Sequence, residues 1–122
     1  LHDHIRFLGP VDDADLPTLY SGARLFVFPS LAEGFGLPVL EAMACGTAVA
    51  CAQTSSLPEV GGAAVAYFDP TDSQAIAQTL LALLPDTTKL DEMAQRGLVQ
   101  AGRFSWEETA VATITHYRRL AQ

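Results

Sequence analysis

The sequence predicts one α/β domain with a Rossmann-like, doubly wound parallel sheet and flanking helices. Short apolar runs alternate along the 122 residues with stretches of helical periodicity. The run at 25–28 is continuously apolar, which is typical of a strand buried on both faces of a parallel sheet. The composition, with 49% hydrophobic and 17% charged residues, is that of a globular domain.

Four apolar runs are the predicted strands. They lie at residues 5–8, 25–28, 48–52 and 65–68. The first ends at the turn pair Gly9-Pro10 and the second at Pro29, residues that interrupt a strand. Because helical stretches separate the later runs, we expect parallel strands joined by crossovers.

The first helices are predicted from the residues that start and stop them. A short helix follows Asp15, which we expect to be its N-cap. A second helix covers 39–45, with Pro38 in its first turn and Gly46 at its end. Residues 55–62 form a loop with one short helical turn.

Three longer helices complete the chain, at 73–84, 90–101 and 106–120. The last opens with a capping box from Ser105 to Glu108. We expect Trp106 and Tyr117 of this helix to pack into the core.

Charge and cysteine content exclude several classes of partner. A net charge of −7 argues against nucleic acid or an anionic membrane surface as a partner of this chain. It leaves room for a phosphate-bearing small ligand, which backbone N–H groups and a helix dipole can hold. Cys45 and Cys51 fit neither a zinc pattern nor a disulfide framework, which indicates reduced thiols in a cytoplasmic protein.

The loop at residues 29–41 is the predicted functional centre. Gly34 and Gly36 give its backbone conformational freedom, and it enters a helix whose first N–H groups have no partners within the helix. This is an anion site suited to a diphosphate. Glu33 and Glu41 flank it and can accept hydrogen bonds from sugar and ribose hydroxyls. Taken singly, these features are more often only an ordinary turn and a glutamate near a helix dipole than a binding site.

The complete string is more specific. The sequence Pro29-Ser30, followed by Glu33-Gly34-Phe35-Gly36-Leu37-Pro38-Val39-Leu40-Glu41-Ala42-Met43-Ala44-Cys45-Gly46, resembles the signature of the group 1 (family 4) retaining glycosyltransferases of GT-B fold. The flanking segments agree with it: they are Phe7-Leu8-Gly9-Pro10-Val11, Leu16-Pro17-Thr18-Leu19-Tyr20, Leu57-Pro58-Glu59-Val60 and Phe104-Ser105-Trp106. The resemblance spans essentially all 122 residues.

The resemblance implies a role for each residue of the motif. Glu33 would contact hydroxyls of the donor sugar and is the expected catalytic residue, and Glu41 would bind the ribose of the nucleotide. The expected donor-binding set is Glu33, Gly34, Phe35, Gly36, Leu37, Pro38 and Glu41.

The resemblance also implies the reaction. A hexosyl group would pass from a nucleotide-diphosphate-sugar to a sugar or lipid-linked acceptor with retention of configuration. The departing diphosphate would assist deprotonation of the acceptor, and neither a cofactor nor a divalent metal is expected. We expect a cytoplasmic protein, peripheral to the inner face of the membrane through a part outside this chain, with a role in polysaccharide biosynthesis.

Several parts of the family pattern have no counterpart here. These are the Arg and Lys that hold the diphosphate, the acceptor-binding N-terminal domain, and the first two strands of the C-terminal domain. Arg6 and Arg24 are not substitutes for the missing cations. We therefore expect residues 1–122 to be a partial C-terminal nucleotide-sugar-binding domain, nearly inactive alone. Its sheet would be completed by repacking, by self-association with a second copy, or by another piece of a cleaved protein.

Other interpretations remain open at this point. A non-catalytic nucleotide-sugar-binding module, a sugar-nucleotide epimerase of the same fold, and a purely structural domain all fit parts of the pattern. Asp13-Ala14-Asp15 has the form of a metal motif, but it precedes a helix, where Asp15 serves better as a cap. Glu59 is a weaker candidate for the donor site.

Overall fold

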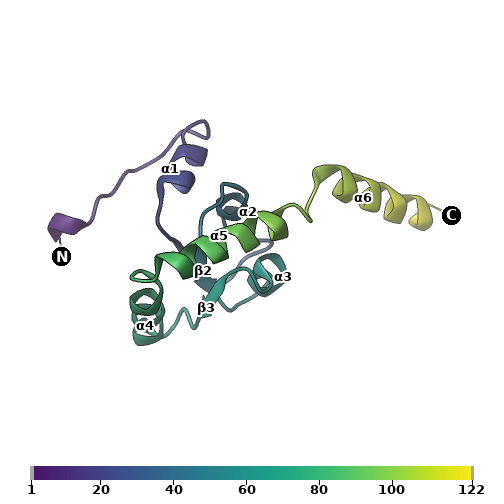
Figure 1. Ribbon diagram of the computed structural model, residues 1–122. Coiled ribbons are helices and arrows are strands. Elements are labelled where there is room, and N and C mark those ends of the chain that lie inside the picture. Colours follow the sequence, from purple (N-terminus) through teal and green to yellow (C-terminus); the bar gives the residue numbers. More distant parts are fainter. Residues whose placement is uncertain (1, 122) are drawn as a thin grey trace.

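Three short parallel strands form the centre of the computed structural model, which describes residues 2–121 (Figure 1). They are β1 (Phe26–Phe28), β2 (Val49–Ala52) and β3 (Ala66–Phe68), side by side in that order. Val27 lies opposite Ala50 on the first pair, and Cys51 lies opposite Tyr67 on the second. Three of the four predicted strands are therefore confirmed, each beginning one residue later than expected.

Helices follow the strands and flank the sheet (Figure 1). A 3-10 turn, η1 (His2–His4), precedes six α-helices: α1 (Leu16–Gly22), α2 (Leu37–Ala44), α3 (Leu57–Gly61), α4 (Ser73–Leu83), α5 (Thr87–Ala101) and α6 (Trp106–Leu120). Helix α2 packs against β1 and β2, α4 packs against β3, and α5 lies along α2. This is the predicted parallel α/β arrangement.

The helix starts differ from the predictions at three places. Helix α2 begins at Leu37, two residues earlier than predicted. Helix α5 begins three residues earlier than predicted because the Asp86 carboxylate accepts the backbone N–H of Lys89 at 3.0 Å. Asp15 precedes α1, but its side chain accepts no hydrogen bond, so the predicted cap is not made. Its φ of −93° and ψ of −19° are already helical, whereas a capping side chain needs an extended backbone to reach the next N–H groups.

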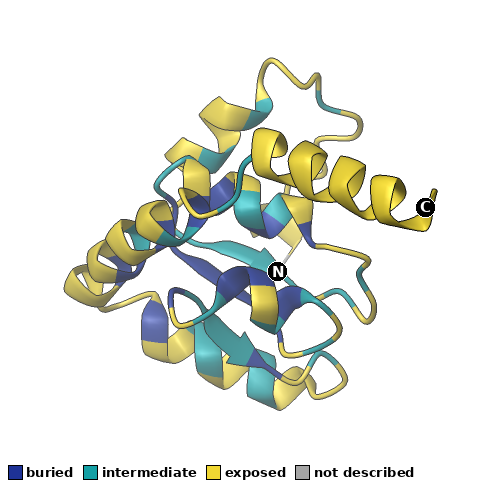
Figure 2. Cartoon of the chain, turned by 90° about the vertical axis from the view of Figure 1, so that its right-hand side faces the viewer, coloured by how far each residue is buried: buried dark blue, intermediate teal, exposed yellow. Residues whose placement is uncertain are grey.

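The core lies between the sheet and its helices (Figure 2). All four residues of β2 are buried, as expected for the middle strand. Met43 of α2 packs closely against α5, where a Cβ on Gly97 would lie 3.3 Å from the Met43 Cγ. The largest fully buried side chains are Met43, Leu57, Val39, Val49, Val60 and Cys51.

The predicted strand at residues 5–8 is wrong. Phe7 is 92% exposed, and Ile5 and Leu8 are more than half exposed, on a segment that leads away from the sheet (Figure 1). An apolar run becomes a strand only where a neighbouring strand offers its backbone groups, and within residues 2–121 none is placed to do so. The outer edge of β1 is unpaired for the same reason, and β1 is half-buried instead of buried on both faces.

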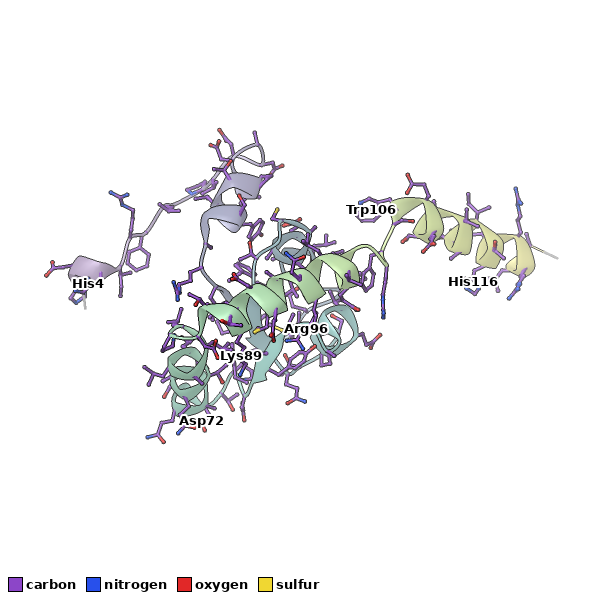
Figure 3. All side chains as sticks on the ribbon, in the orientation of Figure 1. His4, Asp72, Lys89, Arg96, Trp106 and His116 are labelled. Atoms are coloured by element: carbon purple, nitrogen blue, oxygen red, sulfur yellow. The ribbon has the colours of Figure 1, made fainter. Side chains whose placement is uncertain are left out.

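Helix α6 projects from the opposite side of the body (Figure 1). The predicted capping box is confirmed in part: the Ser105 hydroxyl oxygen accepts the backbone N–H of Glu108 at 3.0 Å, but among the described residues the Ser105 N–H makes no return bond to the Glu108 side chain. The predicted packing of Trp106 and Tyr117 into the core is wrong, because every described residue of α6 is exposed (Figures 2 and 3). Among the described residues, no helix has both the length and the apolar character needed to cross a membrane.

Candidate functional site

The predicted site residues all lie between the carboxyl end of β1 and the second turn of α2. Residues 29–36 form the connecting loop, which we call the motif loop. Ligands of parallel α/β sheets bind where loops leave the carboxyl ends of the strands. The fold therefore places the motif loop at the usual position for a binding site.

Gly36 fixes the geometry of the helix start. Its φ is +101°, and a Cβ built on it would lie 2.6 Å from Cδ2 of the fully buried Leu57. Its carbonyl accepts the N–H of Val39 at 3.0 Å and that of Leu40 at 3.3 Å, so α2 begins immediately after it. A side chain at this position would meet both an unfavourable backbone conformation and the core.

Four consecutive backbone N–H groups at the end of the motif loop and the start of α2 have no acceptor among the described residues. Among residues 2–121, no hydrogen bond is donated by the N–H of Gly34, Phe35, Gly36 or Leu37. These groups lie at the N-terminus of α2, where the helix macrodipole is positive. Consecutive free donors at a positive helix end can bind a phosphate or another anion.

Glu33 stands beside these donors and is held in place. Its side chain is half-buried, and its Oε1 accepts the hydroxyl of Ser30 at 2.9 Å. A second carboxylate oxygen is thereby left for another donor.

Side chains of the loop after β2 donate hydrogen bonds to backbone carbonyls of the motif loop. The Ser56 hydroxyl donates to the carbonyl of Phe35 at 2.8 Å and lies 3.2 Å from the carbonyl of Glu33. The Thr54 hydroxyl donates to the carbonyl of Ser30 at 3.1 Å. Carbonyls of the motif loop thus face the hydroxyls of Thr54 and Ser56.

Glu41 is exposed in the second turn of α2, where it meets α1. Its Oε2 accepts the hydroxyl of Tyr20 at 3.1 Å. Burial of the ring, and then the hydrogen bond to Glu41, raise the pKa of Tyr20 to about 12. The phenol is therefore protonated and remains a donor throughout the neutral range.

Apolar side chains border the free N–H groups. Phe35 and Leu37 are each about two-fifths exposed. The Phe35 ring makes an edge-to-face contact with Phe104, with 5.8 Å between the ring centroids. This contact connects the motif loop to the segment that leads into α6.

Other sequence candidates lie elsewhere. Glu59 is exposed and lines a surface hollow together with Arg96 and Arg103. No residue of the motif loop lines this hollow. Arg24 donates two hydrogen bonds to the carbonyl of Leu84, at 2.8 and 3.0 Å, which agrees with the expectation that it does not replace a phosphate-binding cation.

Both cysteines are free thiols, as predicted. Cys51 is buried, and this burial raises its pKa to about 12. Within the described part of the chain, no three His, Cys, Asp or Glu side chains gather as metal ligands would.

Sequence reasoning missed the residues that support the site. In the sequence, Ser30 stands out only as part of the motif string, Tyr20 only as part of a flanking segment, and Ser56 only as part of a loop. Tyr20 and Ser56 each act on a partner 21 residues away, which only the tertiary structure brings near. Ser30 and Glu33 are three residues apart, but in an irregular loop this spacing does not determine which side chains meet.

Comparisons with known proteins identify the family of the chain. Residues 1–100 match the sequence model of the family described as Glycosyl transferases group 1. The chain is 51% identical over 116 residues to the O-antigen chain mannosyltransferase B of Escherichia coli, which covers 95% of this chain and 30% of that protein. The chain thus spans less than a third of the length of that relative.

Two solved structures have the same fold. Sucrose-phosphate synthase from Thermosynechococcus elongatus superposes with a TM-score of 0.84 and 32% identity, over 97% of this chain and 30% of the other. The C-terminal domain of a group 1 glycosyl transferase from Francisella tularensis gives a TM-score of 0.70 and 33% identity, over 80% of this chain and 51% of the other. The chain therefore has the α/β fold of a GT-B domain and belongs to the group 1 glycosyltransferases.

Proposed function

We propose that this chain binds the donor of a retaining glycosyltransferase, a nucleotide-diphosphate-sugar. The observation that carries the proposal is the row of four free N–H groups, Gly34 to Leu37, between Glu33 and Glu41. In the donor, a sugar, a diphosphate and a ribose are linked in that order. The diphosphate requires hydrogen-bond donors, and the sugar and ribose on either side of it require acceptors for their hydroxyls.

Each part of the donor has a matching part of the site. The diphosphate lies at the N-terminus of α2, Glu33 accepts hydroxyls of the sugar through its free oxygen, and Glu41 accepts hydroxyls of the ribose. The exposed ring of Phe35 supplies apolar surface beside the sugar. Glu33 is the residue that we assign to the reacting sugar and name as catalytic.

The chemistry follows from this placement. The bond between the anomeric carbon and the diphosphate breaks, and its electron pair stays on the phosphate oxygen. The acceptor oxygen forms its bond to the same carbon on the same face, and its proton passes to the departing diphosphate. The free N–H groups and the positive helix end stabilise the negative charge that develops there, without a divalent metal being required in the proposal.

Mannose is the first sugar to test, because the E. coli relative with 51% identity is named as a mannosyltransferase. We propose that the acceptor, a sugar or a lipid-linked sugar, is bound by a part of the enzyme outside these residues. The 122 residues alone would then bind donor without transferring it.

Calorimetric titration of the natural full-length protein with uridine, guanosine and adenosine diphosphate sugars tests the proposal. We expect one of them to bind and Glu41→Ala to weaken that binding by about tenfold, the effect of losing a charged hydrogen-bond acceptor. Incubation with acceptor should then yield a glycoside with the anomeric configuration of the donor, measured by NMR. Absence of binding by all three would contradict the proposed function, and an inverted product would contradict retention.

A further inference from the structure

Tyr20 makes contacts with β1 and Thr47 in addition to its hydrogen bond to Glu41. Its ring packs edge-to-face on Phe26 of β1, with 5.2 Å between the centroids and 86° between the planes. Its backbone carbonyl accepts the hydroxyl of the buried Thr47 at 2.6 Å. Thr47 lies three residues after Ala44, the last residue of α2, and donates its own N–H to the carbonyl of Ala42 at 3.0 Å. Tyr20 is thus tied both to β1 and to the end of the helix that carries Glu41.

Glu41, by contrast, has few restraints of its own. It is exposed on the surface of α2, and Tyr20 is its only side-chain partner among the described residues. A free glutamate in a helix samples several rotamers, and ordering it costs conformational entropy. A hydrogen bond from a rigid phenol selects one rotamer in advance and lowers that cost when a ligand binds.

We propose that Tyr20 is a positioning residue that fixes the Glu41 carboxylate for the ribose hydroxyls of the donor, and so sets the preference for ribonucleotides over deoxyribonucleotides. The inference rests on the proposed function, in which Glu41 accepts those hydroxyls. Tyr20 occupies Oε2 of Glu41, which leaves Oε1 free for the ligand. A carboxylate held in this way distinguishes a ribose from a deoxyribose by the number of hydroxyls, because a deoxyribose has fewer hydroxyls to donate to the free oxygen.

A purely structural role for the contact is the competing explanation. In that case the Tyr20 hydroxyl would only join α1 to α2, and its loss would weaken all ligands equally. The two explanations differ in one measurable quantity, the ratio of the affinities for a ribonucleotide and its deoxy counterpart.

The test uses Tyr20→Phe in the natural full-length protein. This change removes the hydroxyl and keeps the ring that packs on Phe26. Tyr67→Phe is the matched control, because Tyr67 is also a half-buried tyrosine whose hydroxyl donates to a carbonyl, that of Gly62 at 2.8 Å, outside the motif loop. The probes are guanosine, uridine and adenosine diphosphates and their 2′-deoxy and 3′-deoxy forms, with dissociation constants from calorimetry.

We expect wild type and Tyr67→Phe to prefer a ribonucleotide over its deoxy forms. Tyr20→Phe should bind the ribonucleotide about 3- to 10-fold more weakly, the range of one partly exposed hydrogen bond to a charged group, and should weaken the deoxy forms by a smaller factor, because each keeps only one of the two hydroxyls. The ratio is taken within one protein, so a loss of folded material affects both affinities alike and cancels.

The failures are distinguishable. If Tyr20→Phe weakens both kinds of nucleotide equally, or neither, Tyr20 does not position Glu41, and the proposed function stands. A wild-type protein without preference for ribose, in which Glu41→Gln has no effect either, would instead overturn the proposed ribose contact and this inference with it.

Discussion

Substitution of Gly36 by alanine gives the sharpest test of how the motif loop is built. The φ of Gly36 is +101°, a backbone conformation that costs any residue with a Cβ roughly 1–2 kcal/mol. The new Cβ would also lie 2.6 Å from Cδ2 of Leu57, and Leu57 has no exposed surface into which it could move. Overpacking of this kind costs about 1–3 kcal/mol. We therefore expect the free energy of unfolding to fall by about 2–5 kcal/mol, a large part of a typical domain's stability.

Gly34→Ala is the matched control, two residues earlier in the same loop. A Cβ at Gly34 meets nothing within 4 Å, and its φ is outside the left-handed region. Its effect on stability should stay within about 1 kcal/mol. Urea-induced unfolding, followed by circular dichroism, measures both variants. Equal stabilities for the two variants would show that neither the positive φ of Gly36 nor its closeness to Leu57 requires a glycine at this position.

Three further predictions concern the site and the core. Glu33→Gln should reduce turnover by at least about 100-fold in a steady-state assay while the fold remains intact, and unchanged turnover would remove Glu33 from the reaction. Ser56→Ala should lower the free energy of unfolding by about 1 kcal/mol and weaken donor binding, because the carbonyl of Phe35 loses its 2.8 Å donor; calorimetry that finds wild-type affinity would exclude this support role. Burial raises the pKa of Cys51 from its ordinary value of 9.0 to about 12, so the unfolded chain loses this proton first and stability should fall as pH rises from 9 to 12. Cys51→Ala should flatten that part of a stability-versus-pH curve, and an equally steep curve would contradict the assignment.

Local signals predicted most of the fold. The three confirmed strands are short apolar runs, each closed by a turn or a polar residue, and they are joined by crossover helices whose periodicity is visible in the sequence. The start of α6 was predicted because Ser105 and Glu108 lie three residues apart and make their bond within one turn. Such signals need no knowledge of the rest of the chain.

The failures are non-local. The run at residues 5–8 has a strand's composition, but no described strand is available beside it. The core packing expected of Trp106 failed because the apolar face of α6 meets no other element in the described chain (Figure 3). At the site, Tyr20 and Glu41 are 21 residues apart, and only the packing of α1 on α2 brings them together.

A crystal structure of the natural full-length protein with a nucleotide-diphosphate-sugar bound tests the central claim most directly. We predict that the diphosphate oxygens lie within hydrogen-bonding distance of the N–H groups of Gly34 to Leu37, with Glu33 on the sugar hydroxyls and Glu41 on the ribose. A donor bound elsewhere, for example in the hollow lined by Glu59, Arg96 and Arg103, with those four N–H groups still free, would contradict it.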